Sequence, residues 1–219
     1  MMTEKKTPLE NPLRLTVGNL KGGVARSTTS IMLALALVQR TGQRVLLVDA
    51  DRANGTSFEW SEYAGEVWPA EVNVVYLPSQ LLGKRVREMW PDGHLIIDTG
   101  NDSTTLRQAL MVTDQLLMPI GATPSEATRL TPTLQAAAEV ASIKPIELSI
   151  LFTRTKPNTI SFREAWEQLK QMEGDVEGLH VLDVNVPFQL LYSQAFGTAP
   201  TNLGVYPEVL DEILTGGSR

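Results

Sequence analysis

The chain has 219 residues, of which 42% are apolar and 20% are charged, and its formal net charge at pH 7 is −6. This composition is typical of a globular protein, and the length suits one α/β domain or at most two small ones. The chain contains no cysteine, which excludes disulfides, thiolate metal sites and iron–sulfur clusters. The acidic net charge identifies no partner, because an acidic chain can still bind nucleic acid through a local basic patch.

Residues 1–12 carry mixed charges and two prolines, and they predict a flexible segment ahead of a single domain at 13–219. They lack the apolar core of a secretory signal. The longest apolar runs of the chain are far too short to span a bilayer, so we expect no membrane partner.

Residues 15–30 combine an apolar strand, a glycine-rich turn and the start of an apolar helix. The helix is expected at 28–40, and because it is apolar almost all round it should be buried against a sheet. Strand, turn and helix in this order are the layout of a phosphate-binding loop. Small residues let backbone N–H groups close around phosphate oxygens, and the helix N-terminus adds partial positive charge. An ordinary glycine turn before a core helix is the alternative.

The turn departs from the generic phosphate-loop pattern G-x-x-x-x-G-K-[ST]. When the pattern is aligned on Ser27, its two glycines fall on Leu20 and Ala25, and its lysine falls on Arg26. Arginine keeps the positive charge, but its longer, planar side chain is not equivalent to lysine at a close-packed site. Ala25 replaces a glycine at a point where the backbone can require unusual torsion angles. Both changes predict weaker nucleotide binding or slower hydrolysis.

Acidic residues end two of the predicted strands. The apolar run 44–49 is typical of a parallel strand covered on both faces; it ends in Asp49, and Asp51 follows. A second apolar run, 94–98, ends in Asp98. Carboxylates at the C-terminal ends of parallel strands face the ligand crevice, although an acidic turn in solvent is the alternative for each of them.

Strands and helices alternate along the rest of the chain. This alternation predicts a mostly parallel, doubly wound α/β sheet with helices on both faces, as in P-loop NTPases. Residues 57–70 are rich in Trp, Tyr, Pro and Glu and predict irregular structure with at most one short helix. The further strands are expected at 72–77, 115–120, 146–153 and 181–186, and the further helices at 79–90, 103–113, 124–142, 159–172 and 207–214.

Three segments together resemble the ParA/MinD family of deviant Walker-type ATPases. Residues 21–28 resemble its loop K-G-G-V-G-K-T-T, with alanine and arginine at the fifth and sixth positions as the departures. Residues 49–55 are similar to the family's D-x-D-P-Q-x-N, and residues 95–99 closely resemble its Walker B element, hydrophobic residues followed by D-T. The resemblance spans roughly residues 13–214 and looks most like a short ParA partition protein without an N-terminal helix-turn-helix.

The resemblance implies a set of site residues around ATP or ADP with Mg²⁺. In the family's pattern Ser27 gives its hydroxyl to the metal, while Asp49 and Asp98 hold the water shell of the metal. Asp51 positions or deprotonates the attacking water, and Lys21 neutralises phosphate charge on the nucleotide of a partner subunit. The implied catalytic residues are Lys21, Asp51 and Arg26, and the implied nucleotide-binding residues are Lys21, Gly22, Gly23, Val24, Ala25, Arg26, Ser27 and Thr28, with Thr153, Arg154, Pro187 and Phe188 at the base.

The resemblance also implies a function, namely DNA segregation by a cytoplasmic, nucleoid-associated bacterial protein. Such a protein forms a face-to-face homodimer with ATP, binds DNA without sequence preference, and hydrolyses ATP weakly when a ParB-like centromere-binding protein stimulates it. Two alternatives stay open. One is a nucleotide-gated adaptor that binds ATP without significant hydrolysis. The other is a small P-loop ligase of the dethiobiotin-synthetase type, against which the pairing of Lys21 with Asp49 and Asp51 argues.

A membrane-associated, MinD-like role is not expected. The last predicted helix carries Glu208, Asp211 and Glu212 where such a role requires a basic amphipathic face. The sequence does not locate the surface that would bind DNA. Two basic clusters are candidates, although each can equally be a solvated face: Lys84, Arg85 and Arg87, and Arg154, Lys156 and Arg163.

Overall fold

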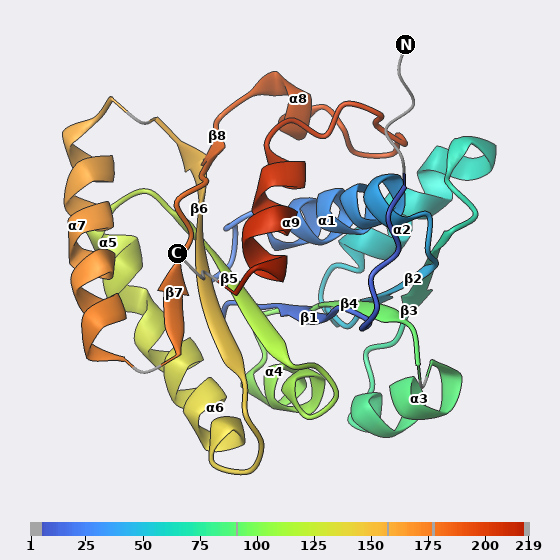
Figure 1. Cartoon of the computed structure of the whole chain (residues 1–219), viewed down its shortest axis with the longest axis horizontal. Helices are drawn as coiled ribbons and strands as arrows, with labels where there is room; N and C mark the ends of the chain where they lie inside the picture. The colour runs from blue at the N-terminus through green and yellow to red at the C-terminus, as the bar shows by residue number, and fades with distance from the viewer. Residues whose placement is uncertain (1–5, 91, 157, 177, 217–219) are drawn as a thin grey trace.

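The computed structural model describes residues 6–90, 92–156, 158–176 and 178–216. These residues form an eight-stranded sheet in the order β3-β2-β4-β1-β5-β6-β7, with β8 beside β6, and its strand pairings are parallel (Figure 1). The predicted doubly wound, mostly parallel α/β sheet is therefore confirmed. The strands are β1 (Arg14–Val17), β2 (Val45–Asp49), β3 (Val72–Tyr76), β4 (His94–Asp98), β5 (Gln115–Gly121), β6 (Glu147–Thr155), β7 (Leu179–Val181) and β8 (Val186–Pro187).

Helices cover both faces of the sheet (Figure 1). One face is covered by α1, α2 and α9, and the other by α3, α4, α6 and α7, with a hydrophobic core on each side. The helices are α1 (Arg26–Thr41), α2 (Thr56–Ala64), α3 (Leu82–Met89), α4 (Ser103–Leu110), α5 (Pro124–Ala127), α6 (Thr131–Ala141), α7 (Ile160–Asp175), α8 (Leu190–Ser193) and α9 (Tyr206–Leu214), with 3₁₀ turns at Gly65–Val67 and Thr128–Leu130.

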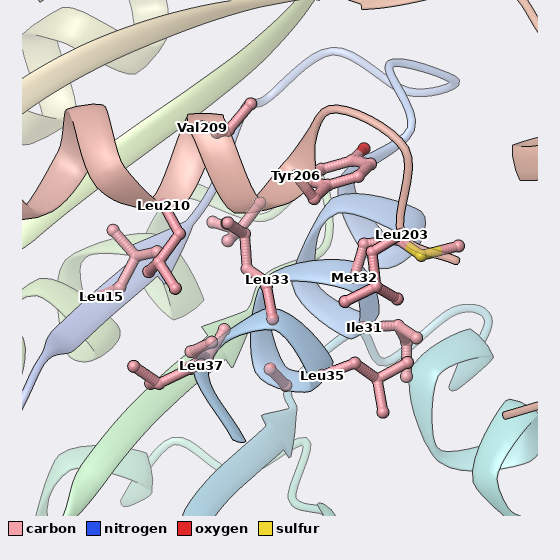
Figure 2. Packing of buried hydrophobic residues seen from close by; sticks show 14 of the residues in the cluster. Leu15, Ile31, Met32, Leu33, Leu35, Leu37, Leu203, Tyr206, Val209 and Leu210 are labelled. Atoms are coloured by element: carbon pink, nitrogen blue, oxygen red, sulfur yellow. The ribbon is translucent and has the colours of Figure 1, made fainter. Parts of the chain in front are cut away.

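Helix α1 is buried on nearly all sides, because apolar residues fill positions 31–38. Helix α9 packs across it, and Figure 2 shows Tyr206 and Leu210 of α9 close to Leu33 of α1. The buried hydroxyl groups of Tyr206 and Thr29 form a hydrogen bond of 3.0 Å. Each fully buried large apolar side chain contributes about 1.5–3 kcal/mol. This packing therefore holds the first turn of α1, and with it the loop that precedes α1, in a fixed place.

The strand order reverses at β1, which lies between β4 and β5. From β1 the chain moves outward to β2 and β3, returns to β4, and then continues on the other side of β1 with β5, β6 and β7. At such a switch point a crevice opens outside the carboxyl ends of the strands, and ligands of doubly wound proteins bind there. The loop that follows Val17 therefore starts at the edge of the sheet where a ligand is expected.

Two predicted elements were wrong in detail. The helix expected at 124–142 is divided into α5, a 3₁₀ turn and α6, because Pro132 lies in the first turn of α6 and cannot continue a preceding helix. The strand expected at 181–186 is split into β7 and β8. Between them, the amides of Asp183 and Val184 donate to the carboxylate of Glu212 in α9 and not to a neighbouring strand.

The irregular region expected at 57–70 contains a regular helix, α2, followed by a 3₁₀ turn. Residues 1–5 of the expected flexible segment lie outside the described residues. Farther along that segment, the amide of Thr7 donates to the carbonyl of Arg40 (3.0 Å) and the amide of Leu9 donates to the side chain of Gln43 (2.9 Å), so this part is tied to the domain. Among the described helices, none has both the length and the apolar composition that crossing a bilayer requires.

Candidate nucleotide-binding site

The loop between β1 and α1 contains two residues in the left-handed backbone region. Gly23 has φ 72° and Ala25 has φ 63°. Glycine adopts this region freely, whereas a residue with a Cβ pays about 1–2 kcal/mol for it. Ala25 therefore holds the torsion angles expected of a glycine, at the position where the phosphate-loop pattern has one. Ala25 is the N-cap of α1 but makes no side-chain cap, which leaves the first N–H groups of the helix available to an anion.

Arg26 points back into this loop. Its side chain is only 9% exposed, and its guanidinium donates to the carbonyls of Asn19 (2.8 Å) and Lys21 and to Oδ1 of Asn101 (2.7 Å). Burial lowers the pKa of Arg26, and the nearby charges of Asp98 and Asp51 oppose that shift. An arginine keeps its proton in proteins, so the site contains a fixed buried cation. This cation ties the phosphate loop to the loop after β4.

The carboxylates that end two strands lie side by side at the same edge of the sheet. In the register of the sheet Asp98 of β4 is paired with Asp49 of β2 on one side and with Val17 of β1 on the other. The order of the strands therefore brings these two carboxylates to the same edge of the sheet. Both aspartates are buried, and Asp98 contacts Ser27 in the first turn of α1.

Asp98 has the most perturbed carboxyl group of the site. Burial and the charge of Asp49 raise its pKa to about 7, and the hydroxyl groups of Ser57 and Ser27 and the charge of Arg26 offset part of that rise. Its Oδ2 accepts a hydrogen bond of 2.6 Å from Ser57, while its Oδ1 is buried and has no hydrogen-bond partner among the described residues. Burial therefore accounts for both the raised pKa and the unpartnered Oδ1 of this carboxyl group.

Asp49 and Asp51 are held by backbone amides of the segment that follows β2. The carboxylate of Asp49 accepts from the amides of Asp51 (3.1 Å) and Phe58 (3.0 Å), and burial raises its pKa. The carboxylate of Asp51 accepts from the amide of Ala53 (2.9 Å) and the side chain of Asn54 (3.0 Å). The segment thus places two carboxylates beside the loop at defined positions.

The glycine that follows β4 leaves room for this arrangement. A Cβ on Gly100 would lie 2.7 Å from Oδ1 of Asp51, so a side chain at that position would displace the carboxylate. Glycine at position 100 therefore permits the loop after β4 to approach the carboxylate of Asp51 closely.

These residues fit a magnesium ion held together with phosphates. Among the described residues, no group of three or more His, Cys, Asp or Glu side chains is placed so that it could hold a metal ion by itself. Mg²⁺, however, is usually bound through one or two carboxylates, waters and the phosphates of a substrate. The unpartnered Oδ1 of Asp98, with the hydroxyl of Ser27 close by, provides the hard oxygen donors that such an ion requires.

The four residues that were expected to contact the base of the nucleotide lie together beside the phosphate loop. A cavity of about 100 Å³ is lined by Thr153, Arg154, Pro187 and Phe188 together with Ala25 at the start of α1. Phe188 is 60% exposed, so its ring is available for contact. The buried hydroxyl of Thr153 lies within hydrogen-bond distance of two backbone carbonyls, one of them that of Val24 (3.1 Å). This hydroxyl therefore contacts the backbone of the phosphate loop at Val24.

Lys21, the lysine expected to reach a partner subunit, is paired within its own chain. Its ammonium forms an ion pair with Glu126 of α5, and its amide donates to Oδ1 of Asn19 (3.0 Å). Gly22, Gly23 and Ser27 follow it along the loop as expected, and the side chain of Val24 is buried in the protein, so only its backbone is available to a ligand.

Four residues of the site were not predicted from the sequence. Asn19, Ser57, Asn101 and Glu126 contact loop or carboxylate residues that were predicted. The position of Asn101, three residues after the end of β4, could have indicated it, because strand ends form the crevice. Ser57 and Glu126 belong to no recognisable local pattern.

The two basic clusters lie on different sides of the molecule. One is on α3, and the other is on the segment from β6 to α7, at the opposite end of the sheet (Figure 1). In the first cluster Lys84 lies 3.8 Å from Glu88. The second contains Arg154 and Lys156, which line a cavity together with Glu126, the ion-pair partner of Lys21. The second cluster is therefore the one that adjoins the candidate site.

A glycine loop between a central strand and a buried helix, with a carboxylate ending the adjacent strand, defines a P-loop nucleotide-binding protein. A family model described as an AAA domain matches residues 14–89. The "Maintenance of carboxysome distribution protein A" of Gloeobacter kilaueensis is 31% identical over 153 residues, which cover 68% of this chain and 66%, just under two thirds, of that protein. The "Chromosome partitioning protein ParA" of Caulobacter vibrioides is 57% identical over 42 residues, 19% of this chain and 15% of that protein.

Solved structures share the fold over nearly the full chain. A plasmid partition protein from Borrelia burgdorferi is 18% identical with a TM-score of 0.66, and covers 94% of this chain and 99% of its own. A Cyanothece McdA variant in complex with ATP is 18% identical with a TM-score of 0.70 over 94% and 95%. Cobyrinic acid a,c-diamide synthase from Mycobacterium smegmatis, with a bound ATP analogue and magnesium, is 20% identical with a TM-score of 0.69 over 93% and 94%.

The chain is similar to ParA-like, deviant Walker-type ATPases in its sequence and in its fold. The resemblance found in the sequence is thereby confirmed, and two of the solved neighbours contain nucleotide, one ATP and the other an ATP analogue with magnesium. The assignment of individual site residues stays a prediction.

Proposed function

We propose that this protein is an ATP-driven positioning protein that distributes a cargo over bacterial DNA. In this proposal it binds Mg²⁺-ATP, forms a face-to-face homodimer, binds DNA without sequence preference, and hydrolyses ATP weakly until a ParB-like partner stimulates it. The observation that carries the proposal is the presence of two cations in the loop. Arg26 already supplies a cation within the subunit, so Lys21 at the loop entrance, once it leaves Glu126, would bind phosphate on a second subunit.

Each polar group of the site has a role in this proposal. The backbone N–H groups of the loop and of the first turn of α1 hold the phosphates. Ser27 and Asp98 are the residues that would hold Mg²⁺, directly or through its waters, and Mg²⁺ would neutralise charge on the phosphates during transfer. Asp51 would orient the attacking water, since its carboxylate is fixed by Ala53 and Asn54 next to the loop.

Weak hydrolysis follows from the position of Arg26. Its guanidinium is bound to two loop carbonyls and to Asn101, and it must exchange some of these hydrogen bonds before it can contact a phosphate. Charge-assisted hydrogen bonds contribute about 1.5–3 kcal/mol each when they are lost without replacement. This exchange of hydrogen bonds by Arg26 therefore raises the barrier to ATP hydrolysis in the isolated protein. A partner that favours the state in which Arg26 contacts phosphate would accelerate hydrolysis.

The cargo could be DNA or a protein compartment. The curated relatives with similarity over most of the chain are named for carboxysome distribution, at 24–31% identity, whereas the match to a chromosome partitioning protein is confined to 42 residues. This difference favours a protein assembly as the cargo and an adaptor protein on that assembly as the partner. The ligase alternative has support at the level of the fold alone.

The test is DNA binding under nucleotide control. The protein with Mg²⁺ and a non-hydrolysable ATP analogue should bind unrelated DNA duplexes with equal affinity, and the affinity should fall steeply as salt rises, because counterions are released from the phosphates. The ADP form and the Lys21→Ala variant should bind weakly. Equal binding in the ATP and ADP forms, or binding that depends on sequence, would contradict the proposal.

A further inference from the structure

The ion pair between Lys21 and Glu126 is shielded from solvent. The side chain of Lys21 is 23% exposed and that of Glu126 is 17% exposed, unlike the exposed pairs elsewhere on the described surface. The second carboxylate oxygen of Glu126, Oε2, is buried without a hydrogen-bond partner among the described residues. Solvent screens the attraction within this pair less than it screens an exposed pair, and removal of one partner would leave the other charge partly buried and uncompensated.

The backbone around Glu126 leaves a specific space for its carboxylate. A Cβ on Gly121, at the end of β5, would lie 1.9 Å from Oε2 of Glu126, so any other residue at position 121 would displace the carboxylate. Glu126 itself is held on α5, whose first turn contains Pro124. The carboxylate therefore occupies a built position beside the entrance of the phosphate loop.

We infer that Glu126 is a positioning residue that holds Lys21 within its own subunit and must release it before the ATP-bound dimer can form. This inference rests on the proposed function, in which Lys21 contacts the nucleotide of the partner subunit. One ammonium cannot pair fully with Glu126 and bind phosphate across an interface. The phosphates and Glu126 therefore compete for Lys21, and the strength of the Lys21–Glu126 pair sets the protein concentration at which dimers appear.

Release of Lys21 leaves the Glu126 carboxylate in a favourable electrostatic environment. Glu126 lines a cavity of about 470 Å³ together with Arg154 and Lys156, both exposed. An unpaired buried carboxylate would be costly, but cations along the same cavity reduce that cost. Lys21 can therefore move from Glu126 to phosphate and back, as one release in each ATP cycle requires.

The test compares wild type with Glu126→Gln, which keeps the shape of the side chain and removes its charge. Sedimentation velocity with Mg²⁺ and a non-hydrolysable ATP analogue measures the protein concentration at half dimerisation. Loss of a partly buried ion pair changes an equilibrium by about tenfold. Because two pairs are released in each dimer, Glu126→Gln should dimerise at a roughly hundredfold lower protein concentration. Glu139→Gln, which breaks the exposed pair between Glu139 of α6 and Arg107 of α4, should leave the concentration unchanged.

Two further measurements separate this inference from the proposed function. Binding of ADP by calorimetry should be equal in wild type and Glu126→Gln, and the double variant Lys21→Ala/Glu126→Gln should fail to dimerise as Lys21→Ala does. If wild type dimerises with ATP and Glu126→Gln dimerises no better, Glu126 does not restrain Lys21 and the proposed function stands. If the ATP analogue binds but neither protein dimerises, both the proposed function and the role of Glu126 are wrong.

Discussion

Replacing Asp98 by asparagine should stabilise the protein at neutral pH and leave its stability unchanged in acid. The pKa of Asp98 is raised from 3.8 to about 7, mainly by burial and then by the charge of Asp49. Between these two values the folded protein binds a proton that the unfolded chain has released. The free energy of unfolding of the wild type must therefore fall as pH rises through this interval. Asparagine does not ionise, so the free energy of unfolding of Asp98→Asn does not fall in this way.

The size of the effect follows from the same shift. A carboxyl group whose pKa rises from 3.8 to about 7 on folding loses about 4 kcal/mol of stability once pH exceeds the folded value. Relaxation around the buried Asp49–Asp98 pair reduces this figure, so we expect Asp98→Asn to gain about 2–4 kcal/mol near pH 8 and close to nothing near pH 4. The hydrogen bond from Ser57 can be kept, because the amide oxygen of asparagine accepts it.

Urea unfolding of the nucleotide-free protein at several pH values measures this difference directly. Asp102→Asn is a matched control, since Asp102 caps α4 near the surface and its pKa is lowered by hydrogen bonds from Thr105. That variant should show no gain at neutral pH. If the difference between Asp98→Asn and wild type is the same at both ends of the pH range, the burial cost assigned to Asp98 is wrong.

Three other substitutions test separate parts of the site. Asp51→Ala should keep the affinity for Mg²⁺-ATP and lose turnover, because it removes the group that orients water; unchanged hydrolysis in a phosphate-release assay would remove Asp51 from catalysis. Ala25→Gly should raise the free energy of unfolding by about 0.5–1 kcal/mol, since glycine takes φ 63° without strain, whereas Ala138→Gly in the exposed middle of α6 should lower it by about 1 kcal/mol. Equal effects of these two glycines would refute the strain at Ala25. If the ring of Phe188 stacks on the base, Phe188→Ala should weaken the binding of ATP and of ADP by the same factor, about tenfold, in calorimetry. An unchanged affinity would place the base elsewhere.

The parts of the site that the sequence predicted are those that depend on local order along the chain. Continuous apolar runs predict buried parallel strands, and the residues that end such strands lie at the carboxyl edge, so Asp49 and Asp98 could each be assigned to that edge. The positive φ at Ala25 was also predictable, because it stands where the phosphate-loop pattern has glycine. Neither inference needs knowledge of a distant segment.

The parts that the sequence did not predict depend on partners far apart in the chain. Glu126 lies 105 residues from Lys21, and nothing in α5 itself indicates that its carboxylate meets the loop. The split between β7 and β8 depends on Glu212 of α9, which accepts backbone amides that a strand would otherwise have paired. The inward direction of Arg26 depends on Asn101, which only the packing of β4 beside β1 brings within reach.

Nucleotide binding is the central claim, and titration calorimetry with Mg²⁺-ATP and Mg²⁺-ADP on the full chain tests it most directly. The account predicts one site per chain for either nucleotide, and binding should weaken in Arg26→Ala, which removes the buried cation of the loop. The absence of measurable binding of both nucleotides at millimolar concentration would falsify the account, since the loop, the carboxylates and the base cavity would then share no ligand.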